Sequence, residues 1–144
     1  MDSIRITHQR DLDIAFTIRK TVFVDEQKVS LEDEFDEFDN LNGLCEHILV
    51  YSNNLAVGTG RIRVVDGIGK LERICILMPY RKQGFGNVIV QALEAIAKEK
   101  GISQVKLHAQ TYAEIFYSKL GYLTSSDVFM EDGIPHILMK KDLN

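Results

Sequence analysis

The chain has 144 residues, of which 45% are hydrophobic, and this is enough to bury a core without disulfides or a metal. We therefore expect one domain over residues 1–144. The net charge of −4 and the absence of a basic stripe argue against nucleic acid as a partner. There is no apolar run of about 18 residues, and residues 1–15 are too polar for a secretory segment, so we expect no membrane span and a cytoplasmic protein.

The first half of the chain predicts a strand, a helix and a three-stranded meander. Residues 3–7 alternate like a strand, and an apolar pattern at spacings of three and four predicts an amphipathic helix at Leu12, Ala15, Ile18 and Val22. After an acidic segment, strands are expected over residues 47–52, 56–65 and 70–77. Turn residues separate them, which predicts an antiparallel meander.

Residues 25–40, here called the acidic segment, hold eight acidic residues and one lysine. This gives the segment a net charge of −7 and leaves +3 on the rest of the chain. Such a segment suits a cationic ligand such as a protonated amine, and it is equally typical of a solvated loop. Both interpretations stay open at this point.

The second half predicts two helices and three strands. An apolar face on one side predicts a helix that begins near Asn87 and ends at Gly101. A strand over 104–109 and a short helix over 112–120 follow, and two last strands are expected over 123–130 and 135–140.

The stretch Arg81–Gly86 lies between an apolar strand and the first of these helices. Glycines at 84 and 86 allow backbone N–H groups to approach an anion at the positive end of the helix dipole, so the loop predicts a ligand with phosphates. A plain tight turn is the alternative. A dinucleotide fingerprint fits less well, because Ile89 stands where a third glycine is required and the next strand has no carboxylate.

This order of elements, the Arg81–Gly86 loop and the segment Ala113–Tyr122 together resemble the GNAT acyltransferase family. The loop matches the family motif Arg/Gln-x-x-Gly-x-Gly/Ala, and the second segment matches A-x-x-F/L-Y-x-K-L-G-F/Y. Residues 22–27 and 131–136 are similar to the ElaA-type branch of small bacterial members. The resemblance covers nearly the whole chain.

The resemblance implies an α/β (α+β) fold with a mixed, mostly antiparallel sheet, splayed between its fourth and fifth strands and flanked by helices. Acetyl-CoA is expected in that gap, with the backbone of Ile76 as a donor to the thioester carbonyl. At the position where many relatives have an asparagine, this chain has a glutamine, Gln110. The residues implied for the cofactor are Ile74, Cys75, Ile76, Arg81, Lys82, Gln83, Gly84, Phe85, Gly86, Asn87, Gln110 and Tyr117.

The resemblance also implies direct attack of an amine on the thioester, which needs a base and an acid. Tyr117 matches the family's general acid, and a tyrosine that only packs in the core is the alternative. Glu72 is the expected base, with a structural ion pair to Arg61, Arg63 or Arg73 as the alternative. Glu26 is a second candidate as acid-base residue or acceptor ligand.

His136 is a candidate for the acceptor site, although a lone histidine is often structural. No metal site is expected, because Cys45, His47, His108 and His136 lack the usual ligand spacing. Cys45 and Cys75 are expected as buried free thiols.

We therefore expect an acetyl-CoA-dependent N-acetyltransferase that acts on a small, cationic amine. Two alternatives remain, a non-catalytic acyl-CoA-binding sensor and a transferase that modifies a protein N-terminus or lysine. A homodimer and a monomer are both compatible with the sequence.

Overall fold

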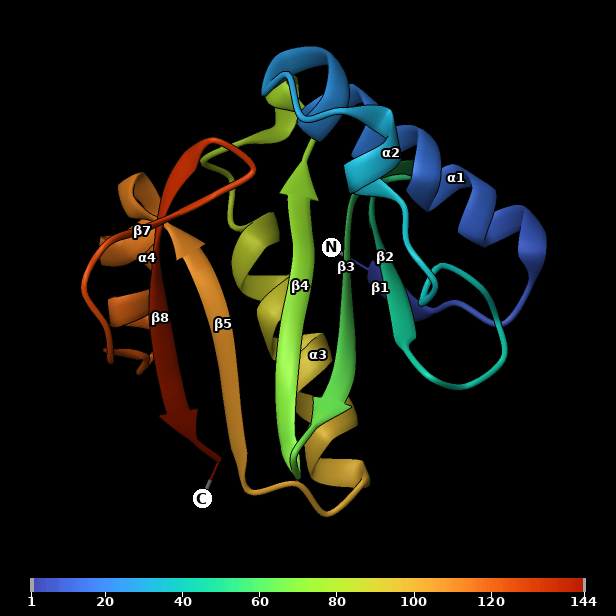
Figure 1. Cartoon of the computed structure of the whole chain (residues 1–144). Helices are drawn as coiled ribbons and strands as arrows, with labels where there is room; N and C mark the ends of the chain where they lie inside the picture. Colours follow the sequence, from blue (N-terminus) through green and yellow to red (C-terminus); the bar gives the residue numbers. More distant parts are fainter. Residues whose placement is uncertain (1, 144) are drawn as a thin grey trace.

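The computed structural model describes residues 2–143, and its centre is one eight-stranded sheet with the strand order β1-β2-β3-β4-β5-β8-β6, in which β7 pairs with β8 (Figure 1). The strands are β1 Asp2–Arg5, β2 Glu46–Ser52, β3 Leu55–Val65, β4 Ile68–Ile76, β5 Gln104–Gln110, β6 Leu123–Thr124, β7 Phe129–Glu131 and β8 Ile134–Asp142. The α-helices are α1 Gln9–Arg19, α2 Leu31–Glu34, α3 Phe85–Glu99 and α4 Glu114–Lys119.

Three helical segments of other types complete the structure. A π-helix, η1 (Lys20–Glu26), continues directly from α1, and the 3-10 turns are η2 (Met78–Tyr80) and η3 (Thr111–Ala113). The sequence pattern predicted that the first helix would continue through Val22. The helical path and its apolar face do continue, but from Lys20 onward the turns are the wider turns of a π-helix. The N–H of Gln27 bonds to the carbonyl of Val22, five residues back. Such π-turns are rare and are often found at functional sites.

The mixed, mostly antiparallel α/β sheet expected from the sequence is confirmed, including the meander β2-β3-β4. Only β4 and β5 are parallel, and their pairing is limited to Gly69–Leu71 against Val105–Leu107. Beyond these pairs the two strands diverge, as Figure 1 shows. The register between β3 and β4 shifts at the same level, where Arg73 has a φ of 57°. A bulge of this kind bends a strand, which helps β4 turn away from β5.

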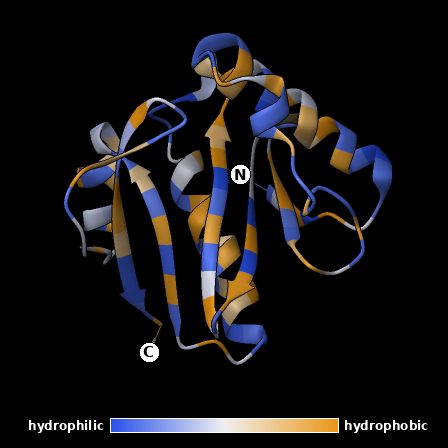
Figure 2. Cartoon of the chain, viewed as in Figure 1, coloured by the Kyte–Doolittle hydropathy of each residue, from blue (hydrophilic) through white to orange (hydrophobic). Residues whose placement is uncertain are grey.

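Helices cover both faces of the sheet. On one face, α3 packs Ile89, Val90 and Leu93 against the centre of the sheet, in a core that also includes Tyr117 of α4. On the other face, α1 packs Leu12 and Ile18 against Leu49 and Cys75. Figure 2 shows apolar and polar residues alternating along β4 and β5, and the buried residues of β5 all pack in the α3 core.

The acidic segment is ordered and folds back onto the sheet. Arg19 bonds to Glu34 and Asp39, and Arg61 bonds to Asp36 and Asp39. Phe38 lies under the guanidinium of Arg63, at 4.4 Å. Three of its eight acidic residues, Glu34, Asp36 and Asp39, thus pair with buried arginines. The segment is therefore neither a fully solvated loop nor, as a whole, a site for a cationic ligand.

The expectation of one strand over residues 123–130 is wrong. The strand is split into β6 and β7, and Ser125 and Ser126 lie between them. The hydroxyl of Ser126 accepts the N–H of Leu138 in place of a backbone carbonyl, which interrupts the ladder. None of the helices within residues 2–143 is both long and apolar enough to cross a membrane.

Candidate active site

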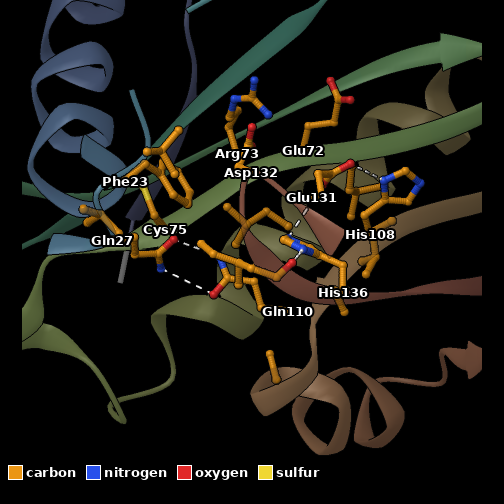
Figure 3. A pocket seen from close by; sticks show the side chains of 18 of the residues that line it. Phe23, Gln27, Glu72, Arg73, Cys75, His108, Gln110, Glu131, Asp132 and His136 are labelled. Carbon is orange, nitrogen blue, oxygen red and sulfur yellow. Dashed lines mark hydrogen bonds and ion pairs between the residues drawn. The ribbon is translucent and has the colours of Figure 1, made fainter. Parts of the chain in front are cut away.

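A cavity of about 180 Å³ opens where β4 and β5 part. Its walls come from η1, from the diverging halves of β4 and β5, from α4 and from the turn between β7 and β8. Figure 3 shows Gln27 turned towards Gln110, and Glu131 turned towards His108 and His136. The splayed sheet therefore creates a pocket in which residues distant in sequence meet.

The Arg81–Gly86 loop has the geometry of an anion-binding site. Lys82 and Gly84 both have left-handed backbones, with φ of 64° and 92°, and α3 begins directly after Gly84. Within residues 2–143, no hydrogen bond uses the backbone N–H groups of residues 82–87; the first N–H satisfied inside α3 is that of Val88. Donors grouped in this way at a helix N-terminus suit the phosphates of a bound ligand.

Gly86 permits a close approach of α4 to this loop. A Cβ atom at position 86 would lie 3.0 Å from the ring of Phe116. Phe116 in turn packs edge-on against the ring of Tyr117, with centroids 5.0 Å apart. The second glycine of the loop thus brings the helix that carries Tyr117 next to the anion-binding N–H groups.

The end of β4 presents backbone groups to the gap. Leu77 donates its N–H to Val57 on β3, while the carbonyl of Ile76 points the other way and accepts from Nε of Arg81, at 2.9 Å. Because the N–H and the carbonyl of one strand residue lie on the same side, the N–H of Ile76 also faces away from β3. The side chains of Ile74 and Ile76 pack on the α3 core, and Cys75 packs on the α1 core.

Arg81 joins the loop to the π-helix. Its guanidinium donates to both carboxylate oxygens of Glu26, at 3.1 and 2.9 Å. Glu26 is not among the residues that line the cavity. Its surroundings thus favour a role in positioning Arg81 over the expected role as base or acceptor ligand.

Tyr117 projects from α4 into the cavity and is only 9% exposed. Burial raises the pKa of its phenol well above the usual range, so the hydroxyl stays protonated at neutral pH. No side chain or backbone group within the described part of the chain hydrogen-bonds to this hydroxyl. The proton is therefore available to a ligand.

Glu72 lines the cavity, but its carboxylate forms ion pairs with three cationic side chains. Its carboxylate contacts Arg61 at 3.0 Å, Arg63 at 2.9 Å and Lys70 at 2.9 Å. Burial by itself would raise the pKa of Glu72, but the hydrogen bonds from Arg63 and Lys70 and the charge of Arg61 outweigh it and lower the pKa to about 2. Such a carboxylate takes up a proton poorly at neutral pH, so its surroundings do not support the expected role as base.

Gln110 spans the cavity. Its Nε2 donates to Oε1 of Gln27 at 2.8 Å, linking the end of β5 to the residue after the π-helix (Figure 3). This amide pair lies at the level where the resemblance placed a cofactor contact, and it shows that Gln110 reaches the gap.

A cluster that the sequence did not predict lies at the β7–β8 end of the cavity. Nδ1 of His108 lies 2.8 Å from Oε1 of Glu131, and Nε2 of His136 lies 3.6 Å from Oε2 of the same carboxylate (Figure 3). Phe129 lies against both imidazoles. His136 was a candidate from the sequence, whereas His108 and Glu131 had no assigned role; the position of Glu131 and His136 on either side of the Asp132-Gly133 turn was the available signal.

The two cysteines are buried free thiols, as expected. Burial raises the pKa of Cys45 to about 12 and that of Cys75 above the usual range, so neither is a thiolate nucleophile at neutral pH. Within residues 2–143, no group of three or more His, Cys, Asp or Glu side chains is arranged to hold a metal ion.

Comparisons with known proteins agree with this geometry. Residues 20–143 match the family model of the acetyltransferase (GNAT) domain. A Bacillus subtilis protein named as an acetyltransferase is 61% identical over 141 residues, which are 98% of this chain and 96% of that protein. The crystal structure of Escherichia coli ElaA superposes with a TM-score of 0.84 and 28% identity, over 97% of this chain and 98% of ElaA.

A protein of Lactobacillus plantarum whose crystal structure is described as that of an N-acetyltransferase has a TM-score of 0.90 and 29% identity, over 99% of this chain and 98% of that one. The resemblance to the GNAT family and to ElaA is thereby confirmed, and with it the splayed α/β fold. The chain belongs to the GNAT acetyltransferase family and is an acyltransferase.

Proposed function

We propose that the protein transfers an acetyl group from acetyl-CoA to the primary amine of a small metabolite. The observation that carries this proposal is the meeting of two features in one gap. The free N–H groups of residues 82–87 follow Arg81, which lines the gap, and the unpaired hydroxyl of the buried Tyr117 opens into the same gap. Neighbouring elements thus provide N–H groups for the phosphates of an acyl donor and a hydroxyl that can donate a proton.

The residues of the gap fit acetyl-CoA. Consecutive N–H groups of residues 82–87, in a loop whose backbone is left-handed at Lys82 and Gly84, would hold the pyrophosphate. Arg81 is held beside this loop by its ion pair with Glu26. The backbone of Ile74–Ile76 lies along the open edge of β4, where it would hold the pantetheine arm by strand-like hydrogen bonds. The N–H of Ile76 is our donor to the thioester carbonyl oxygen.

When bound, acetyl-CoA supplies the thioester whose acetyl carbon the amine attacks. Tyr117 then gives its proton to the leaving sulfur, and the proton that the attacking nitrogen loses as the amide forms restores the phenol. A phenol whose pKa is raised by burial remains able to do this, because the same burial also disfavours a thiolate. Glu72 takes no proton in this scheme; its ion pairs with Arg61, Arg63 and Lys70 hold the wall of the cavity.

The test measures CoA release from acetyl-CoA with a thiol reagent, across polyamines, amino sugars, amino acids and N-terminal peptides. Calorimetric binding of acetyl-CoA is measured in parallel. Turnover with one class of small amine is the expected result. Tight binding without turnover supports a sensor instead, turnover only with peptides supports a protein-modifying enzyme, and a lack of binding would remove the assignment of residues 82–87.

A further inference from the structure

We propose that Glu131 and His136 form the seat of the acceptor amine, in which Oε2 of Glu131 and Nε2 of His136 each accept one N–H bond of a primary ammonium and His136 removes one of its protons. This inference rests on the proposed function and names the chemistry of its acceptor site.

The tautomer of His136 follows from its partners. Nδ1 lies 2.7 Å from the carbonyl oxygen of Ile134. A carbonyl oxygen only accepts, so Nδ1 carries the hydrogen and, in the neutral ring, Nε2 presents a lone pair. His136 is 6% exposed, and its ring stacks on Phe129, so its orientation is fixed by packing.

Glu131 is oriented from its other side. His108 places Nδ1 2.8 Å from Oε1, and because a carboxylate only accepts, Nδ1 of His108 is the donor. This hydrogen bond is the main cause that lowers the pKa of Glu131, so the carboxylate is ionised at neutral pH. Oε2 is left facing Nε2 of His136.

In the neutral form of His136, Nε2 and Oε2 of Glu131 are therefore two acceptors that lie 3.6 Å apart. This distance is too long for a direct hydrogen bond, and two lone pairs repel unless a donor lies beside both. A primary ammonium has three N–H bonds, so it can donate to both atoms and keep one for a further partner. A quaternary ammonium carries the same charge but has no N–H to give.

The charges around the cavity single out this carboxylate. Of the acids that line it, Glu34 and Glu72 are held by arginine or lysine, and Asp132 is exposed at the turn. Within residues 2–143, Glu131 forms ion pairs only with the two imidazoles. The other charged or titratable groups that line the cavity are Lys70, Arg73, Cys75, Arg81, His108, Tyr112 and Tyr117.

The proton balance of the step is simple. One N–H bond of the ammonium breaks, its electron pair stays on nitrogen as the nucleophilic lone pair, and the proton binds Nε2 of His136. The resulting imidazolium lies beside the Glu131 carboxylate, which offsets its charge. The imidazolium returns the proton to water after the product leaves.

The first experiment uses the unmodified chain and needs no acetyl-CoA. Side-chain nitrogen NMR spectra near neutral pH report the protonation of each of its four histidines, and His136→Asn assigns the signal. We expect the Nε2 signal of His136 to shift on addition of n-butylamine and to stay in place with n-butyltrimethylammonium or n-butanol. An imidazolium in the free protein, or equal shifts with both amines, would overturn the proposal.

The second experiment measures turnover with the best amine found in the panel. Glu131→Gln and His136→Asn should each lower kcat/KM by about 10²-fold or more, with acetyl-CoA affinity within about twofold of the unmodified protein. Matched controls are Glu37→Gln and His8→Asn, which change exposed side chains and should leave turnover intact. Thermal melting verifies folding, and Glu131→Gln, whose side chain is 40% exposed, remains informative if His136→Asn does not fold.

Binding of the amine by Glu131 and His136 and transfer of the acetyl group can be tested independently. Normal turnover in Glu131→Gln and His136→Asn would overturn the amine seat while the acetyltransferase proposal stands. A lack of acetyl-CoA binding by the unmodified chain would overturn the acetyltransferase proposal, and the NMR response to n-butylamine would still decide whether this pair binds a primary ammonium.

Discussion

Arg61 and Glu72 face each other across β3 and β4, with Nη2 of Arg61 and Oε1 of Glu72 3.0 Å apart and side chains that are 2% and 8% exposed. Asp36 and Asp39 also contact Arg61, and these contacts fasten the acidic segment to the sheet. The pair therefore belongs to a buried network that stabilises one wall of the cavity.

Replacing Glu72 with Gln tests this structural role. Removal of one partner leaves cations without compensation in a buried site, and we expect a loss of about 3 kcal/mol in the free energy of unfolding. Urea unfolding measures it, with Glu37→Gln as a control at an exposed position. Retained turnover per folded molecule is expected; a normal stability combined with a turnover lost by about 10²-fold would restore Glu72 as the base.

The same network predicts loss of stability in acid. Burial opposes ionisation of Asp36, Asp39 and Glu72, but hydrogen bonds and charges from arginines lower the pKa of each below its usual value. These groups contribute stability that is present above the unfolded pKa values of about 4 and is lost as pH falls through the folded values, about 2 for Glu72.

Glu34 acts in the opposite direction, because burial raises its pKa and its charged form opposes folding at neutral pH. Three lowered groups outweigh one raised group, so we expect the melting temperature to fall between about pH 4 and pH 2. Melting curves across this range measure the effect. A flat profile would mean that the ion pairs of the acidic segment add no stability.

Gly84→Ala tests the anion-binding loop. Gly84 has a φ of 92°, so an added Cβ strains the backbone by about 1 to 2 kcal/mol and moves the N–H groups that follow it. Calorimetry should show acetyl-CoA affinity reduced by about tenfold or more, the loss of about one charge-assisted hydrogen bond. Gly67→Ala is the matched control, because Gly67 has a φ of 78° in the β3–β4 turn.

Both glycine variants should lose similar stability, and only the change at position 84 should weaken binding. Equal affinities would place the phosphates of the ligand elsewhere.

Tyr117→Phe removes a hydroxyl while keeping the ring that packs on Phe116 and Tyr122. We expect kcat to fall by about 10²-fold, with acetyl-CoA affinity and melting temperature nearly unchanged. Steady-state kinetics and calorimetry on the same preparation separate these effects. Unchanged turnover would exclude Tyr117 as the acid.

The sequence predicted most of the fold because its signals are local. Apolar spacing located α1 and α3, turn residues located the meander, and the glycines at 84 and 86 located the loop before α3. These patterns depend on neighbours in the chain, so they can be recognised without the structure. The resemblance to the GNAT family then correctly indicated where the sheet opens.

Only the tertiary structure decided which ionisable side chains are free to react. Glu72 and Glu26 were chosen from their positions along the chain, but folding brings Arg61 and Arg81 against them from distant elements. Folding likewise joins Glu131 to His108, 23 residues earlier, and turns both towards the cavity. The charge, burial and partners of a carboxylate depend on contacts between elements far apart in sequence. These contacts determine whether it forms a structural ion pair or can bind a substrate.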